Sequence, residues 1–186
     1  MNCDSNNTES YASCIEIKTD NICAKGRHPE DILSNLCNND FCFDGVQCGC
    51  MESFLQSLKC QDANEQRKIC ILGGGDIKEH PIYSKGTDKT FWWKGRSFER
   101  NSPEFEDLIR SAFEAMYLWC GRFRDALMAT LGKQLHYDSC TGNTILTDQE
   151  FCKILIELRE SRKDEYKQCI YPRLWPNSYG VDEDYV

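Results

Sequence analysis

Apolar residues recur with helical spacing in several segments, and this pattern constrains the fold more than any other feature. Met51, Phe54, Leu55 and Leu58 lie at i, i+3, i+4 and i+7, which places them on one face of a helix. The same periodicity predicts helices at about 50–60, 61–72, 103–118 and 122–131, and one that starts near Thr147. Amphipathic helices must bury their apolar faces against a common core, so a compact, mainly helical fold is expected.

Capping signals mark the start of two of these helices. Ser102 followed by Pro103 is a favourable N-terminus, because serine caps free backbone N–H groups and proline suits the first helical position. Thr147-Asp-Gln-Glu150 is a capping-box sequence. The inward faces expected from these starts are Phe105, Leu108, Ile109, Ala112 and Met116, then Phe123, Ala126, Leu127 and Leu131, then Phe151, Ile154, Leu155 and Leu158.

Strand signals are fewer. Residues 14–22 alternate apolar and polar side chains, which predicts a short strand, and Asp44-Gly45 between apolar runs predicts a tight β-hairpin. Residues 73–102, rich in glycine and proline, are expected to form a long connection. The predicted fold is therefore a single α+β domain, mainly α-helical with a small β-hairpin or sheet. It is expected to span 14–170, between a loose N-terminus (1–13) and a polar C-terminal tail (171–186).

Composition excludes several classes of protein. The chain has 186 residues, and no apolar run approaches the roughly 20 needed to cross a bilayer, so no membrane association is expected. The first residues lack the features of a signal peptide, which favours a cytoplasmic location. Twenty-two basic and 30 acidic residues give a net charge of −8, which disfavours non-specific binding of nucleic acid by the whole surface but allows a local basic site.

The 13 cysteines are the unusual part of the composition. An odd number cannot pair completely within one chain, and reduced thiols that fill core positions are the simpler interpretation. Cys48-Gly-Cys50 has one intervening residue instead of the two typical of zinc or redox pairs, and the three histidines are scattered. No metal and no cofactor is therefore expected, although a thiol or metal protein stays a hypothesis.

The helix at 50–60 carries a second stripe of Glu52, Gln56 and Lys59, at i, i+4 and i+7. At about 100° per residue, this stripe lies beside the apolar face instead of opposite to it. A carboxylate, an amide and an amine at the edge of a buried face are able to line a cleft. The alternative is a solvated helix face with a weak ion pair.

A basic segment with two tryptophans, residues 85–100, is a second candidate site. It contains Trp92, Trp93, Lys94, Gly95 and Arg100, with five basic and two acidic residues overall. Tryptophans offer stacking faces and the cations offer phosphate partners. The alternative is that one tryptophan anchors the segment in the core and the other is half-buried. Gly73-Gly-Gly75 hints at a phosphate loop but lacks the Walker pattern, and a flexible turn is the simpler interpretation.

The order of several motifs resembles the NADAR (NAD- and ADP-ribose-associated) family. The motifs are Leu33-Ser-Asn-Leu36, Phe41-x-Phe-Asp-Gly45, Glu52-x-x-x-Gln56-x-x-Lys59, Ala112-Phe-Glu-Ala115, Phe123-Arg-x-Ala-Leu-x-Ala-Thr130, Gln134-Leu-His136 and Ile154-Leu-Ile-Glu-Leu-Arg159. The resemblance covers roughly residues 30–160. The sequence departs from many members in having no tryptophan between Tyr137 and Thr147, where they carry Asp-x-x-Trp-Gly, so it looks like a divergent branch.

The resemblance implies hydrolysis of an N-glycosidic bond. Family members remove ADP-ribose from modified guanine in nucleic acid or hydrolyse small phosphoribosyl-amine metabolites. The matching lysine, Lys59, would attack the ribose anomeric carbon and form a Schiff base, if partial burial lowers its pKa. Glu52 would move protons or activate water. Asn35 and Gln56 would hold ribose hydroxyls or phosphate oxygens. The other expected substrate-binding residues are Trp92, Trp93, Lys94, Gly95, Arg100 and His136. The composition of the tryptophan segment, and not the resemblance, suggests that it covers the base and pyrophosphate.

The expected partner is therefore an ADP-ribose-containing substrate, most simply ADP-ribosylated nucleic acid, with an antitoxin as one biological context. Two alternatives stay open. One is an enzyme of small phosphoribosyl-amines, and the other is a module that binds ADP-ribose without turnover.

Overall fold

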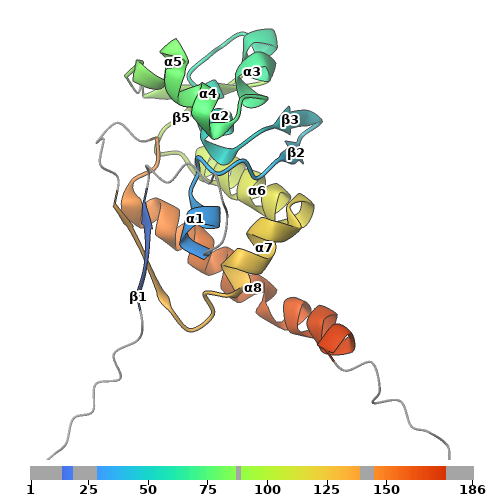
Figure 1. The fold of residues 1–186 in the computed structure, drawn as a ribbon. Coiled ribbons are helices and arrows are strands. Elements are labelled where there is room, and N and C mark those ends of the chain that lie inside the picture. Colours follow the sequence, from blue (N-terminus) through green and yellow to red (C-terminus); the bar gives the residue numbers. More distant parts are fainter. Residues whose placement is uncertain (1–13, 19–28, 87–88, 139–144, 175–186) are drawn as a thin grey trace, which may run out of the picture.

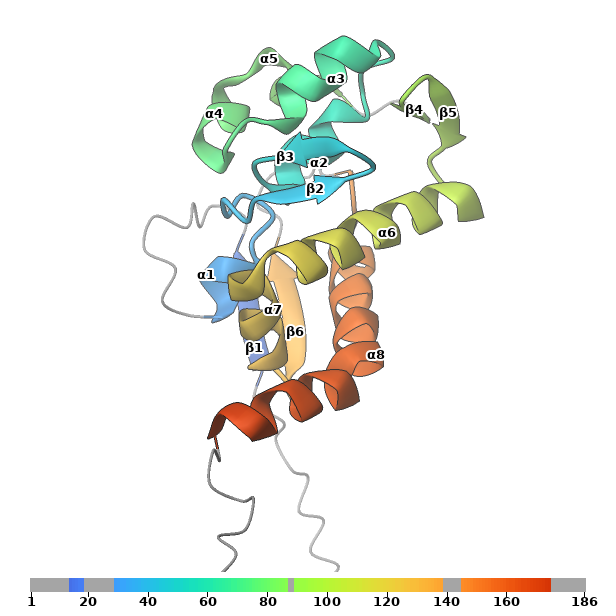
Figure 2. The ribbon, with the colours of Figure 1, turned by 90° about the vertical axis from the view of Figure 1, so that its right-hand side faces the viewer.

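The computed structural model describes residues 14–18, 29–86, 89–138 and 145–174 (Figure 1). The fold is a single, mainly helical α+β domain with small sheets, as predicted. Helix α6 (Pro103–Trp119) runs across the middle of the molecule (Figure 2). On one side of it lie α2 (Met51–Ser57), α3 (Ala63–Cys70) and the hairpin of β2 (Phe41–Phe43) and β3 (Val46–Cys48). On the other side lie α1 (Pro29–Leu33), α7 (Gly121–Met128), α8 (Asp148–Leu174) and the pair β1 (Cys14–Lys18) and β6 (Gln134–Asp138).

The hairpin predicted at Asp44-Gly45 is confirmed. Strands β2 and β3 are antiparallel, with Phe43 opposite Val46. Asp44 and Gly45 have φ angles of 49° and 74°, as a two-residue turn with both central residues left-handed requires. The strand predicted at 14–22 is confirmed over 14–18, where β1 pairs in parallel with β6, and its remaining residues lie outside the described ranges.

The capping predictions are also confirmed. The backbone N–H of Phe105 donates to Ser102 Oγ at 3.2 Å at the start of α6. At the start of α8, Glu150 N donates to Thr147 Oγ1 at 3.2 Å and Thr147 N donates back to the Glu150 carboxylate at 2.7 Å. These reciprocal bonds satisfy N–H groups that a helix leaves without intrahelical partners.

The prediction of a long connection over 73–102 is wrong. The segment contains two short helices, α4 (Gly74–Glu79) and α5 (Pro81–Ser84), followed by the antiparallel strands β4 (Thr90–Trp93) and β5 (Arg96–Glu99). Lys94 and Gly95 form the turn between these strands, with φ angles of 48° and 82°. Lysine is an uncommon residue at a left-handed turn position, so the sequence lacked the Asn-Gly or Asp-Gly signal of a hairpin.

The core contains most of the predicted apolar faces. Its largest fully buried side chains include seven phenylalanines: Phe41, Phe54, Phe91, Phe105, Phe113, Phe123 and Phe151. Leu108, Leu131 and Leu158 are only partly buried at its edge. Cys37, Cys48, Cys50 and Cys70 are buried, which agrees with cysteines as small core residues.

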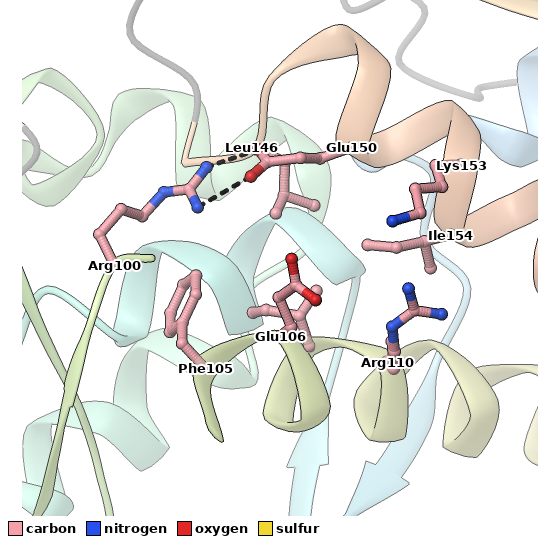
Figure 3. Close-up of a pocket in the computed structure, with 9 residues that line it drawn as sticks. Arg100, Phe105, Glu106, Arg110, Leu146, Glu150, Lys153 and Ile154 are labelled. Carbon is pink, nitrogen blue, oxygen red and sulfur yellow. Dashed lines mark hydrogen bonds and ion pairs between the residues drawn. The ribbon is translucent and has the colours of Figure 1, made fainter. Parts of the chain in front are cut away.

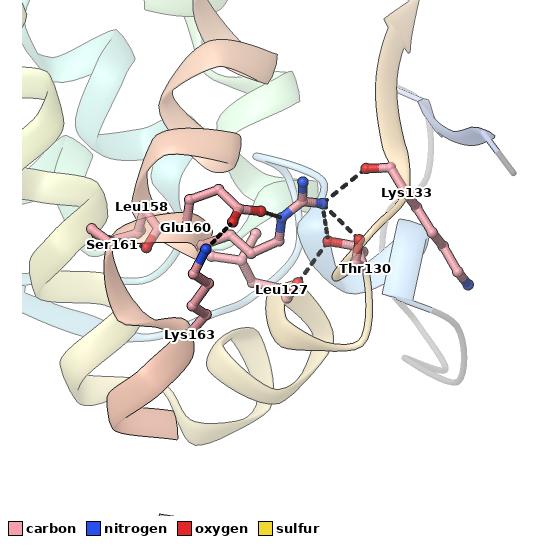
Figure 4. Close-up of polar contacts among 8 residues, drawn as sticks. Leu127, Thr130, Lys133, Leu158, Glu160, Ser161 and Lys163 are labelled. Carbon is pink, nitrogen blue, oxygen red and sulfur yellow. Dashed lines mark hydrogen bonds and ion pairs between the residues drawn. The ribbon is translucent and has the colours of Figure 1, made fainter. Parts of the chain in front are cut away.

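Helix α8 is fixed to the end of α7 by one buried arginine. Arg159 donates to the main-chain oxygens of Thr130 and Lys133 at 2.6 and 3.0 Å, and to Thr130 Oγ1 at 3.0 Å (Figure 4). Thr130 Oγ1 in turn donates to the Leu127 carbonyl at 2.6 Å. Ion pairs of Arg110 with Glu157 and of Arg162 with Glu114 join α6 to α8. None of the helices in the described residues is both long and apolar enough to span a membrane.

Candidate active site

Helix α2 is buried along its whole length, and this decides how its polar stripe is interpreted. The residues of the predicted polar stripe, Glu52 and Gln56 on α2 and Lys59 in the turn that follows it, expose only 8%, 2% and 7% of their surface. The alternative of a solvated helix face is therefore wrong. Charged side chains are rarely so buried unless neighbouring groups bind them, which makes this stripe the strongest candidate site in the molecule.

Glu52 and Gln56 are directly linked. Gln56 Nε2 donates a hydrogen bond of 2.7 Å to Glu52 Oε1. Burial raises the pKa of the Glu52 carboxyl, while the Gln56 hydrogen bond and the charges of Lys59 and Lys78 lower it without cancelling the rise. A carboxyl with a raised pKa retains its proton closer to neutral pH, which suits a group that gives a proton and later takes one back.

The Lys59 amine lies against the main chain of α5. Its Nζ donates to the carbonyl oxygen of Lys85 at 2.6 Å and is 3.5 Å from that of Ile82. The two carbonyl oxygens accept from the Lys59 amine and fix where it lies, one turn beyond Gln56.

Three buried oxygen atoms have no hydrogen-bond donor within the described part of the chain: Asn35 Oδ1, Gln56 Oε1 and Asp148 Oδ1. The first belongs to the same neighbourhood as Glu52, because Glu52 N donates to the Asn35 carbonyl at 2.8 Å. Buried polar atoms are nearly always hydrogen-bonded in folded proteins. Unsatisfied acceptors beside a buried carboxyl are suited to a ligand with hydroxyl donors, such as ribose.

Two tyrosines that the sequence analysis missed also lie near Glu52. Burial raises the pKa of Tyr83, and the Glu52 charge raises it further. Burial also raises the pKa of Tyr137, with added contributions from Glu52 and Asp148. Alternation along β6 was the available signal for Tyr137, because it is buried while its neighbour His136 is exposed. No sequence signal pointed to Tyr83 on the short helix α5.

The tryptophan segment is a hairpin packed on the core. Trp93 is buried, stacks on Phe43 at a centroid distance of 5.7 Å, and donates from Nε1 to Asp44 Oδ2 at 3.1 Å. Trp92 is half-buried, and its backbone N–H donates to the Leu58 carbonyl at 2.8 Å. The structure therefore has the arrangement in which one tryptophan anchors the segment and the other is half-buried.

Two cations of this segment, Lys94 and Arg100, bind acidic groups of the protein. Lys94 Nζ lies 3.2 Å from the Asp44 carboxylate, and Gly95 completes the turn. Arg100 donates to both carboxylate oxygens of Glu150, at 3.0 and 2.5 Å. Arg100 and Glu150 border a cleft between α6 and α8 that none of the α2 stripe residues lines (Figure 3).

His136, another predicted site residue, does not lie on the buried side of its strand. It is exposed on β6, and successive strand side chains point to opposite faces, so His136 points away from the face that carries buried Tyr137. Among the described residues, no group of three or more His, Cys, Asp or Glu side chains is arranged to hold a metal ion.

Comparison with known proteins places the chain in a family. Residues 27–160 match the family model described as bacteriophage protein GP30.3. The chain belongs to this family. It is 36% identical over 141 residues to the uncharacterized 17.1 kDa protein in the Gp30–rIII intergenic region of Enterobacteria phage T4, across 73% of this chain and 93% of that protein.

The fold is shared with a solved structure. The NMR structure of the E. coli protein YbiA superposes with a TM-score of 0.58 at 14% identity, covering 93% of this chain and 92% of YbiA. YbiA is a NADAR-family protein, so the NADAR resemblance is confirmed for the fold, whereas the matching family model is that of GP30.3 and not of NADAR.

Proposed function

We propose that this protein is an N-glycosidase that removes ADP-ribose from ADP-ribosylated guanine in nucleic acid. The observation that carries the proposal is the buried stripe of Glu52, Gln56 and Lys59 beside unsatisfied acceptors on Asn35 and Gln56. A carboxyl that transfers protons, an amine nucleophile and oxygens that bind hydroxyls are together able to cleave an N-riboside. The NADAR-like fold and the matching order of motifs support the same reaction.

In the proposed reaction, Lys59 first loses one proton to solvent. Its amine then attacks the anomeric carbon of the ribose, and the bond from that carbon to the guanine nitrogen breaks. Protonated Glu52 gives its proton to the departing base. The sugar ring opens to a Schiff base on Lys59, and Glu52, now a carboxylate, takes a proton from the water that hydrolyses it, which regenerates the amine and releases ADP-ribose.

Asn35 and Gln56 hold the ribose hydroxyls in this proposal. Trp92 stays a candidate for stacking on the substrate because it is only half-buried. Trp93, Lys94 and Arg100 act mainly by supporting the hairpin and the start of α8, through their contacts with Asp44 and Glu150.

The test is release of ADP-ribose from DNA that carries ADP-ribosylated guanine, with wild type, Lys59→Ala and Lys68→Ala compared. Lys68 is the matched control because it is an exposed lysine on α3. We expect release by wild type and by Lys68→Ala, and a loss of at least 100-fold for Lys59→Ala, since general acid–base and covalent groups contribute about 10²–10⁴. Borohydride trapping should yield a covalent adduct on Lys59. Equal release by all three proteins would contradict the mechanism.

One observation favours a second function, a module that binds ADP-ribose without turnover. The Lys59 amine donates to two main-chain carbonyls. This arrangement suits a lysine that stays protonated as well as it suits a nucleophile. Calorimetry with ADP-ribose decides between the two functions. Tight binding with no product from ADP-ribosylated DNA or from phosphoribosyl-amines would favour the binding module.

A further inference from the structure

We propose that His80 is a positioning residue for Lys59, which it controls by capping the short helix α5. The inference deepens the proposed function and rests on it for the role of the amine. Neither a sequence motif nor the family resemblance assigns a role to His80 or to α5.

The cap consists of one side-chain hydrogen bond. The backbone N–H of Ile82 donates to His80 Nδ1 at 3.2 Å, at the start of α5. Nδ1 accepts this bond only when it carries no proton, so the imidazole proton of the neutral ring lies on Nε2. The cap also fixes the chain before Pro81, which occupies the first helical position.

Helix α5 depends on that cap more than a longer helix would. It has only four residues, none of them buried. A single turn fixes several dihedral angles for one or two hydrogen bonds, so it is unstable without outside support. The support in the structure is the His80 cap together with the packing of Ile82 and Tyr83 at the edge of a small apolar cluster.

Ile82, which His80 caps, also binds the Lys59 amine. Ile82 gives its N–H to His80, and its carbonyl accepts from Lys85 N at 3.2 Å and faces Lys59 Nζ at 3.5 Å. The Lys85 carbonyl, just beyond the helix, accepts from Lys59 Nζ at 2.6 Å. The backbone of residues 82–85 therefore helps to hold the amine, and His80 helps to hold that backbone.

Helix α5 also reaches the second reacting group. Tyr83, between Ile82 and Lys85 along the chain, lies close enough to Glu52 to be affected by its charge. One capped turn therefore contacts the neighbourhood of both Lys59 and Glu52, and a shift of this turn would change their alignment together.

The experiment measures the accessibility of the Lys59 amine and does not depend on activity. Wild type, His80→Ala, His80→Asn and Ser102→Ala are labelled briefly with an amine-reactive N-hydroxysuccinimide ester, and modification of Lys59 is quantified by mass spectrometry relative to exposed Lys68. We expect His80→Ala to raise Lys59 labelling roughly 2- to 30-fold, the factor that corresponds to the usual cost of losing an N-cap. Asparagine caps helices well, so His80→Asn should label like wild type.

Ser102→Ala is the matched control, because it removes an N-cap from a different helix, α6, whereas the carbonyls that accept from Lys59 Nζ belong to Ile82 and Lys85. Thermal melting of each variant checks that it folds. Unchanged Lys59 labelling in His80→Ala, or equal increases in His80→Ala and Ser102→Ala, would overturn the inference. A failure of asparagine to restore the wild-type rate would overturn it as well.

Turnover separates this inference from the proposed function. If Lys59 is the nucleophile, His80→Ala should lower kcat for ADP-ribose release with little change in KM, and His80→Asn should restore it. Labelling that follows the expected pattern while no variant releases ADP-ribose would support His80 as the positioning residue and contradict the proposed glycosidase.

Discussion

Gln56 donates its hydrogen bond to Glu52 from one helical turn further along α2, at 2.7 Å, and both side chains are buried. This bond stabilises the ionised carboxylate and so opposes the effect of burial on the pKa of Glu52. The balance between the two effects determines whether Glu52 holds a proton at a given pH, and it is open to measurement.

Replacing Gln56 by leucine should raise the pKa of Glu52 further. The substitution removes the donor, keeps a similar volume and leaves the carboxyl as desolvated as before. The Glu52 midpoint is measured by NMR titration of protein with ¹³C-labelled glutamate, with Gln149→Leu, an exposed glutamine on α8, as the control. A midpoint that stays in place or falls in Gln56→Leu would show that the amide does not stabilise the carboxylate.

Glu52 should also make the folded protein less stable as pH rises. The folded state holds a proton that the unfolded chain releases near the ordinary glutamate value of 4.5, so the free energy of unfolding declines from about that pH upward through the raised folded pKa. Glu52→Gln removes this decline and keeps a partner for Gln56. Urea denaturation between pH 5 and 8 should show the variant gaining stability relative to wild type with increasing pH. A constant difference across this range would contradict the raised pKa.

Arg159 should be among the most costly polar residues to replace. Arg159→Met leaves the carbonyls of Thr130 and Lys133 without their charged donor, and bonds of this kind contribute about 1.5–3 kcal/mol each. We expect a loss of about 3 kcal/mol in the free energy of unfolding. Arg159→Lys should recover only part of it, because an ammonium group does not reproduce the planar fork of donors.

The control for Arg159 is Arg162→Met on the same helix. Arg162 pairs with Glu114 and Glu165 in partly exposed positions, and such pairs contribute under about 1 kcal/mol. Similar losses for the two variants in guanidinium denaturation would show that the buried acceptors around Arg159 find other donors.

The sequence predicted the five longest helices, α2, α3, α6, α7 and α8, because periodicity and caps are local signals. Ser102 and Thr147 mark helix starts through bonds within three residues, and the structure has both. The burial of Glu52, Gln56 and Lys59 was ambiguous from the sequence, since a stripe beside an apolar face fits either a cleft or a solvated edge. The stripe is buried because segments distant along the chain cover it, above all the backbone of residues 82–85.

Tertiary contacts also explain what the sequence could not show about the tryptophan segment. Trp93 and Lys94 both bind Asp44, about 50 residues earlier, so two hairpin turns hold each other. No local sequence pattern predicts a contact between residues so far apart in the chain. A basic, aromatic composition suggested a surface for an anionic ligand, whereas much of that composition satisfies acidic groups of the protein itself.

The triglycine Gly73-Gly-Gly75 provides a last prediction, because its members differ in their surroundings. The sequence left it as a flexible turn or a phosphate loop, and in the structure it starts α4, with Gly74 N donating to Asn38 Oδ1 at 2.8 Å. A Cβ on Gly74 would lie 1.8 Å from the Leu36 carbonyl oxygen, whereas a Cβ on Gly75 would have nothing within 4 Å.

Alanine at these adjacent positions should therefore have opposite effects. Gly74→Ala forces α4 away from Leu36, the residue after Asn35, and should lower the free energy of unfolding by about 2–3 kcal/mol. Gly75→Ala should be neutral or stabilising by up to about 1 kcal/mol, since alanine favours the helix and reduces the freedom of the unfolded chain. Urea denaturation of both variants measures the difference, and equal free energies of unfolding would show that α4 does not pack closely on Leu36.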